Sequence, residues 1–148
     1  MKKIIFGCCL VSASLLICTA AGAMDPVKVP MKVKAVFHHE YKDAQDVRWT
    51  MRDRDYTVSF RKDGTREMAQ YDWTGHRLDT RVAVPENALP DKVVSHLDKK
   101  YHGNYSHSGT LIERPWKKDL YMVNVHQKGK SVPVYMDKKG HEHGYARR

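Results

Sequence analysis

The feature that most limits how this chain can fold is an internal repeat. Pro30, Val33, Phe37 and Tyr41 recur sixty positions later as Pro90, Val93, Leu97 and Tyr101. A second set recurs sixty-five positions later: Val47, Tyr56, Val58, Phe60, Gly64, Asp72, Gly75 and His76 return as Ile112, Tyr121, Val123, Val125, Gly129, Asp137, Gly140 and His141. One five-residue insertion near HGNYSHSG reconciles the two offsets, so we expect two similar units at about residues 29–80 and 88–143.

Each unit is predicted to begin with a helix. Apolar residues fall three and four positions apart at Val33, Val36, Phe37 and Tyr41, and the second copy repeats this spacing. A proline precedes each segment and suits the first helical turn. In the second copy an acidic residue near the start and two lysines near the end match the helix dipole.

Each helix is followed by segments with the period-two alternation of β-strands. We expect strands at residues 47–51, 56–60 and 68–72 in the first unit, and at 112–116, 121–125 and 132–137 in the second. The predicted fold class is α+β: a tandem duplication of a helix followed by an antiparallel β-meander, with the helices packed on one sheet face. Tyr56, Val58 and Phe60 would face the helix, which leaves Thr57, Ser59 and Arg61 on an open face where a partner would bind.

The stretch YDWTGH, residues 71–76, combines an aspartate, a tryptophan and a histidine that resemble part of a catalytic or metal site. The repeat favours a turn instead, because MDKKGH occupies the equivalent position of the second unit. Both place an aspartate three residues before a glycine, and these residues open and close turns.

The first 23 residues have the pattern of a secretory signal peptide. Lys2 and Lys3 precede an apolar run that ends in small residues at Ala23. A retained membrane anchor would need a longer continuous apolar run. A lipoprotein acylated at Cys18 would need a small residue where the bulky Ile17 stands.

All three cysteines, Cys8, Cys9 and Cys18, lie in this leader. The mature chain, residues 24–148, would then lack disulfides and thiolate chemistry and fold on its hydrophobic core as one domain. We therefore predict a periplasmic or secreted protein, with no stable membrane span after cleavage.

The chain resembles the PepSY-like, beta-lactamase-inhibitor-like envelope proteins of Bacteroidota. The resemblance rests on VPMKVKAVFHHEYKDAQDVRW, then YTVSF, DG and YDWTG, then LPDKVVSHLDKKYHGNYS and a second set of strands, from about residue 29 to 141. Lys42 departs from the pattern, since such sequences commonly have a proline there. The resemblance implies two helix-plus-sheet units and a non-catalytic role in binding or inhibition. The family has no established catalytic residues that could be assigned to positions of this chain. The namesake inhibitors bind an enzyme across a concave sheet surface.

Nine histidines suggest metal binding as an alternative function. His141 and His143 are the candidates, because residues two apart on a strand project to the same face. The competing interpretation is a set of surface polar residues, and pH sensing is a third. We accordingly predict no cofactor and keep a histidine-based metal or small-ligand carrier as the alternative.

The sequence gives no support for an enzyme. Ser95 and His96, and the run 106–108, are merely adjacent, whereas a catalytic triad is assembled by the fold. No nucleophile elbow, zinc-protease helix or phosphate-binding glycine loop is present.

The positive charge favours anionic partners. Removing Lys2 and Lys3 with the leader lowers the formal charge from +9 to +7. Nucleic acid is not expected in the envelope, so an envelope or extracellular protein or an acidic polymer fits better. Trp49 follows Val47 at strand spacing and is expected in the core, whereas Arg61, Trp73 and Trp116 are the candidate partner-binding residues. The leading hypothesis is an exported, non-catalytic binding module, an inhibitor or modulator of another envelope protein.

Overall fold

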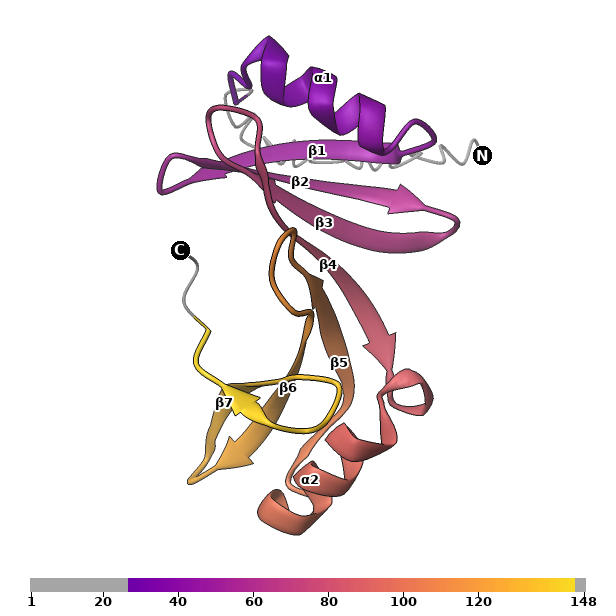
Figure 1. The fold of residues 1–148 in the computed structure, drawn as a ribbon, viewed down its shortest axis with the longest axis vertical. Helices are drawn as coiled ribbons and strands as arrows, with labels where there is room; N and C mark the ends of the chain where they lie inside the picture. Colours follow the sequence, from indigo (N-terminus) through magenta and orange to yellow (C-terminus); the bar gives the residue numbers. More distant parts are fainter. Residues whose placement is uncertain (1–26, 146–148) are drawn as a thin grey trace, which may run out of the picture.

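The computed structural model describes residues 27–145 as one antiparallel sheet of eight strands in sequential order, with two α-helices packed against it (Figure 1). The predicted signal peptide, residues 1–23, and its three cysteines lie outside the described residues. Within residues 27–145, no helix is both long and apolar enough to cross a membrane.

The chain runs through one helix and four strands twice. The first half consists of α1 (Met31–Glu40), β1 (Gln45–Arg52), β2 (Asp55–Lys62), β3 (Thr65–Tyr71) and β4 (Arg77–Pro85). A short 3-10 helix, η1 (Glu86–Ala88), leads to α2 (Asp91–Tyr101), β5 (Tyr105–Glu113), β6 (Leu120–Gln127), β7 (Lys130–Met136) and β8 (Glu142–His143).

The helices and most strands match the sequence predictions, and three differences stand out. The strand β4 was missed entirely, although it joins the two halves by pairing with β3 on one side and β5 on the other. The strand expected at 112–116 instead runs from Tyr105 to Glu113, so the residues from Arg114 onward form a turn. The two-residue strand β8 was also missed.

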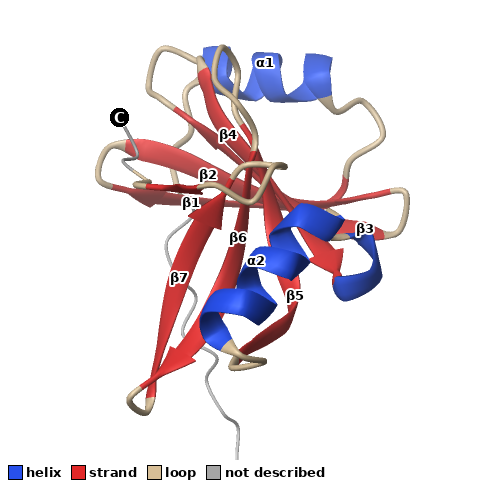
Figure 2. Ribbon diagram, turned by 60° about the horizontal axis from the view of Figure 1, so that its bottom comes forward, coloured by secondary structure: helices blue, strands red, loops and turns tan. Residues whose placement is uncertain are grey.

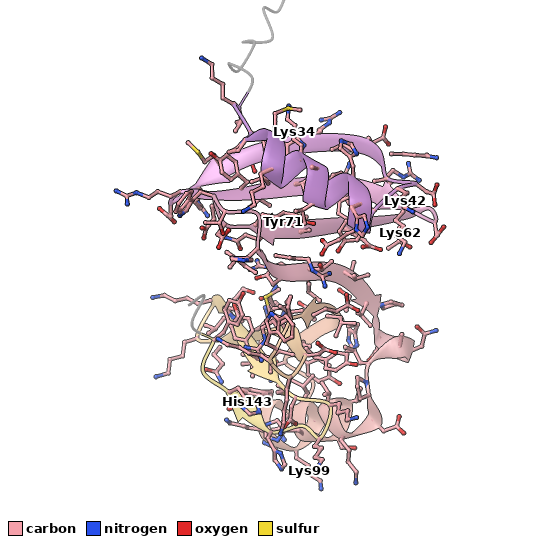
Figure 3. All side chains as sticks on the ribbon, turned by 45° about the horizontal axis from the view of Figure 1, so that its top comes forward. Lys34, Lys42, Lys62, Tyr71, Lys99 and His143 are labelled. Carbon is pink, nitrogen blue, oxygen red and sulfur yellow. The ribbon has the colours of Figure 1, made fainter. Side chains whose placement is uncertain are left out.

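The first half is built around an aromatic core beneath α1. Phe37 of α1 is fully buried, and its ring centroid lies 5.2 Å from that of Phe60 on β2. Trp49 packs edge-on against Phe37, as expected for a core residue. Tyr71 lies between α1 and the sheet (Figure 3), and its hydroxyl donates a hydrogen bond to Glu40 at 2.7 Å. Burying each large side chain of this kind contributes about 2 to 3 kcal/mol.

The second half has its own core beneath α2. It contains Val93, Leu97 and Tyr101 from the helix and Val123, Val125 and Met136 from the sheet. These six residues stand where Val33, Phe37, Tyr41, Val58, Phe60 and Tyr71 stand in the first half, at the offsets of sixty and sixty-five positions. The residues of the sequence repeat therefore perform the same packing roles in both halves.

Both helices lie on the same face of the twisted sheet, as predicted. On β4, Thr80 and Val84 point to one face because they are four residues apart. Thr80 is hydrogen-bonded to Tyr41 just after α1, and Val84 packs into the core beneath α2. Figure 2 shows each helix lying over its own half of the sheet. In the described part of the chain, the opposite face of β1–β4 is therefore not covered by a helix.

Candidate binding surfaces

The uncovered face of β1–β4 is rich in arginine. The strand register aligns Arg48, Ser59, Met68 and Arg81 in one row across the four strands, and Thr50, Thr57, Gln70 and Asp79 in the next. Arg61 and Arg66 are opposite each other on β2 and β3, and Arg52 lies at the end of β1. We call the exposed side chains of Arg48, Arg52, Arg61 and Arg66 the arginine face.

Within the described residues, these four guanidinium groups have no acidic partner. Among residues 27–145, none of them lies within ion-pair distance of a carboxylate. Arg61 donates one long hydrogen bond, at 3.4 Å, to the carbonyl oxygen of Gly64. Arg81 on the same face differs, since its Nε and Nη2 atoms both donate to the carboxylate of Asp79 at 3.1 Å. The positive charge of the arginine face is thus free to meet an external anion.

A hollow of about 320 Å³ lies beside the arginine face. Its lining includes Thr50, Arg52, Thr57, Met68, Gln70, Asp79 and Arg81. Asp79 and Gln70 are the buried members of this lining, and Gln70 donates to Asp55 at 3.2 Å. The lining combines hydroxyl, amide, carboxylate and guanidinium groups with two exposed methionines, Met51 and Met68. Protein interfaces commonly have this mixed composition.

On the second half of the sheet, the last described residue packs against this same face. Tyr145 follows β8 and stacks on Tyr135 of β7, with ring centroids 4.7 Å apart. Its hydroxyl donates to Asp79 at 2.7 Å and accepts from Arg81 at 3.1 Å. Burial acts to raise the pKa of Tyr145, and its hydrogen bond to Asp79 acts in the same direction. Tyr145 therefore occupies this face at β7 and β4, and the exposed side chains of β1–β3 form its more open part.

The stretch YDWTGH forms a turn, as predicted. Asp72 Oδ1 accepts the backbone N–H groups of Thr74 and His76 at 2.8 and 2.9 Å, and the Gly75 N–H donates to the Asp72 carbonyl. Burial acts to raise the pKa of Asp72, but the bonds from Thr74 and His76 outweigh it and lower that pKa. The carboxylate is engaged in holding the turn, and the His76 ring is largely exposed beside it.

The second copy of this turn has the same bonds. Asp137 Oδ1 accepts the N–H groups of Lys139 and His141 at 2.9 and 3.1 Å. Its other oxygen faces two rings, at 3.4 Å from His141 Nδ1 and 3.2 Å from His143 Nε2. Burial acts to raise the pKa of Asp137, but these hydrogen bonds together hold it well below its usual range. The candidate metal ligands His141 and His143 thus converge on one carboxylate oxygen, yet residues 27–145 contain no group of three or more ligands placed to hold a metal ion.

The three predicted partner-binding residues are exposed, but they belong to two surfaces. Arg61 lies on the arginine face near the β2–β3 hairpin. Trp73 is 70% exposed in the β3–β4 turn, and Trp116 is fully exposed in the β5–β6 turn. An open cleft of about 750 Å³ is lined by Trp116 and by Asp72, Gly75 and His76, so the two tryptophan-bearing turns are neighbours. Trp116 was expected at the end of a strand and instead lies in a turn, with a positive φ of 67°.

Sequence reasoning missed Asp79, Arg81 and Tyr145. Asp79 and Arg81 are two residues apart, which is the spacing of side chains on one strand face, and this signal would have paired them had β4 been recognised. The part played by Tyr145 depends on a contact across 66 positions and has no local sequence signal.

No family model matches the chain, and no curated protein matches its sequence. Among solved structures, it is similar to a DUF2874 family protein from Bacteroides ovatus, with 19% identity and a TM-score of 0.71 over 78% of this chain and 85% of that one. A BLIP-like protein from Bacteroides fragilis matches with 19% identity and a TM-score of 0.69 over 80% and 85% of the two chains. A presumed periplasmic protein from Bacteroides eggerthii matches with 12% identity and a TM-score of 0.72 over 78% and 86%. At these identities the likeness is one of fold, and the chain shares the fold of these Bacteroides proteins, among them the BLIP-like one.

Proposed function

We propose that this protein is an exported, non-catalytic binding module that uses the arginine face to dock an acidic surface of another envelope protein. The observation that carries the proposal is the set of four arginines on an uncovered sheet face with no described carboxylate partner. Arginine is enriched at protein interfaces and binds carboxylates through two parallel hydrogen bonds.

The fold and the leader support this role. A BLIP-like protein and a presumed periplasmic protein of Bacteroides have the same fold, and the pattern of residues 1–23 is that of a signal peptide. We infer a periplasmic or secreted location from these two observations together. The resemblance to PepSY-like proteins in particular stays a prediction.

We also infer that residues 24–148 form one domain produced by tandem duplication, with repeats at about residues 29–80 and 88–143. The six matched core positions and the two matching aspartate turns support this inference. The two copies have diverged on the uncovered face, where the first carries free arginines and the second carries Tyr145.

Affinity capture from an envelope extract tests the proposed function. The baits are the mature chain, the triple variant Arg48→Glu, Arg61→Glu and Arg66→Glu, and a control with the same charge change at the exposed Lys42, Lys99 and Lys130. The proposal expects one protein that is retained by the wild type and the control and lost with the arginine variant. Retention of the same protein by the arginine variant would contradict it.

A soluble acidic polymer is the competing occupant of the arginine face. Titration with polyglutamate distinguishes a protein partner from an acidic polymer. If the arginine face binds acidic polymers, it binds polyglutamate with an affinity that falls steeply as salt is added. Equal titration of the mature chain and the arginine variant would show that this face is not the polymer site.

The histidine-based carrier is the second candidate function, favoured by the convergence of His141 and His143 on Asp137. Calorimetry with zinc on the mature chain and on the His141→Ala, His143→Ala variant tests it. Micromolar binding that the double variant abolishes would replace the docking proposal with a carrier.

A further inference from the structure

In an antiparallel meander, every second turn lies at the same end of the strands, and in this sheet four turns share one end. The β1–β2, β3–β4, β5–β6 and β7–β8 turns share one end because all these strands pair antiparallel in sequential order. The hairpins at residues 63–64 and 128–129 lie at the other end. We call the β3–β4, β5–β6 and β7–β8 turns the turn row.

Two clefts show that the members of the turn row are neighbours. The 750 Å³ cleft joins the β3–β4 turn to the β5–β6 turn through His76 and Trp116. A further cleft of about 550 Å³ joins the β5–β6 turn to the β7–β8 turn, and its lining includes Lys117, Lys118, Lys138 and Lys139. The turn row is therefore one continuous surface.

Two tryptophans project from this surface. Trp116 is fully exposed at a positive φ, a backbone conformation that residues with a side chain rarely adopt, and Trp73 is 70% exposed. An indole ring combines a large apolar area with one N–H donor, so it is favoured where water meets the headgroups of a bilayer.

Four lysines lie on the same turn row as the tryptophans, in the β5–β6 and β7–β8 turns. In the described residues, Lys117, Lys118, Lys138 and Lys139 form no ion pair with a carboxylate. The acidic groups nearby are engaged within the protein: Asp137 holds the β7–β8 turn, and Asp119 accepts the Arg114 N–H at 3.4 Å. Glu40 and Asp79 in the larger cleft are bonded to Tyr71 and Tyr145. The ammonium groups are thus free to meet external anions.

We propose that the turn row attaches this protein to the surface of a membrane that contains anionic phospholipid. The tryptophans would enter the headgroup region and the lysines would contact the phosphates, which is how aromatic and basic residues divide at a bilayer surface. A membrane surface is broad enough to contact several turns at once. Its headgroup region also offers apolar contact to the exposed indole rings, which a hydrophilic polymer does not. The turn row and the arginine face have no residue in common, so the membrane proposal and the docking proposal can fail independently.

Flotation with lipid vesicles tests the attachment. The mature chain is mixed with vesicles of phosphatidylcholine alone or with vesicles that also contain 30% phosphatidylglycerol. The buffer contains about 0.1 M salt, which screens long-range electrostatic attraction to the vesicles. We expect binding to the anionic vesicles and little to the neutral ones. Absence of that preference, or binding to soluble polyglutamate without binding to anionic vesicles, would overturn the proposal.

Charge-reversal variants locate the contact. Changing Lys117, Lys118, Lys138 and Lys139 to glutamate is expected to weaken vesicle binding by more than about tenfold. The control carries the same changes at Lys42, Lys62, Lys99 and Lys130, three of which are labelled in Figure 3, and is expected to bind like the wild type. Circular dichroism shows that each variant is folded. Equal losses in both variants would mean that only net charge matters and would overturn the site.

Tryptophan fluorescence gives an independent readout. Anionic vesicles are expected to shift the emission of the wild type to the blue, and brominated lipid is expected to quench it. The Trp73→Phe, Trp116→Phe variant, which keeps only the half-buried Trp49, is expected to lose both effects. An unchanged shift in this variant would refute insertion of the turn row.

Discussion

The hydroxyl of Tyr145 donates a 2.7 Å hydrogen bond to the carboxylate of Asp79, which lies 66 positions earlier on β4. The guanidinium group of Arg81 also lies over the ring of Tyr145, with its Cζ atom 5.9 Å from the ring centroid. Asp79 is 4% exposed, so its carboxylate oxygens depend on these partners for the hydrogen bonds that water would otherwise supply. The end of the described chain is therefore attached to the strand that joins the two halves.

Removing this hydroxyl tests the attachment. Tyr145→Phe is expected to lower the free energy of unfolding by about 1 kcal/mol, because a buried carboxylate loses one of its donors. Urea unfolding measures the change. Tyr56→Phe is the control, since the Tyr56 hydroxyl makes no hydrogen bond within residues 27–145, and a similar loss in both variants would contradict the role given to Tyr145.

Alanine substitutions at three glycines with positive φ distinguish the cost of the backbone conformation from the cost of a steric clash with the added Cβ. Gly64→Ala has nothing within 4 Å of the added Cβ, so we expect only the cost of a left-handed alanine, about 1 kcal/mol. Gly75→Ala places its Cβ 3.5 Å from Val36, an ordinary contact, and is expected to lose about as much.

Gly140→Ala is expected to be the most harmful of the three. Its Cβ would lie 2.5 Å from the backbone carbonyl oxygen of Lys92, so α2 and the β7–β8 turn must move apart. We expect a loss of about 3 kcal/mol, measured by urea unfolding beside the other two. Equal losses at all three positions would show that contact with α2 is unimportant.

The carboxylate of Asp72 is predicted to act as a turn acceptor and not as a reactive group. Asp72→Ala removes the acceptor of two backbone N–H groups and is expected to lower the free energy of unfolding by about 1 to 2 kcal/mol. Asp72→Asn keeps an oxygen at the same place and should lose less than half as much. We expect the same order at Asp137, and a larger loss for asparagine than for alanine would contradict the turn role.

Much of this fold is predictable because local patterns determine it. The spacing of Val33, Phe37 and Tyr41 gives α1, and the alternation through Val58 and Phe60 gives β2 with the correct faces. The repeat added what single patterns lack, since a turn that occurs twice is easier to recognise than one that occurs once. The rule that one helix cannot cover both faces of a sheet also predicted correctly that the helices pack on one face.

The missing elements are those whose stability depends on distant residues. Along β4, Asp79, Thr80 and Arg81 interrupt the apolar alternation, and they are accommodated there because Tyr41 and Tyr145 hydrogen-bond to them. The sequence showed that Arg61, Trp73 and Trp116 would be exposed, but not which of them share a surface. That grouping follows from strand order, which places Arg61 on a face and both tryptophans at one end.

The last prediction concerns acid stability and Glu142. This residue of β8 accepts hydrogen bonds from Lys100 at 2.6 Å and from Tyr101 at 2.8 Å, and it lies 2.8 Å from the ring nitrogen of His96. Burial acts to raise the pKa of Glu142, but these partners outweigh it and lower the pKa from the ordinary 4.5 to about 2. A carboxylate whose pKa is lower in the folded state stabilises the fold fully above pH 4.5, and this contribution disappears as the pH falls to about 2.

Glu142→Gln should therefore destabilise the protein at pH 6 and have progressively less effect at pH 4 and pH 3. Because about a third of the side chain is exposed to water, we expect a difference of only about 1 kcal/mol at pH 6. Urea unfolding at each pH measures it, with Glu113→Gln as the control because that carboxylate makes no hydrogen bond or ion pair in the described structure. A difference that stays constant between pH 6 and pH 3 would mean that the negative charge of Glu142 is not what attaches β8 to α2.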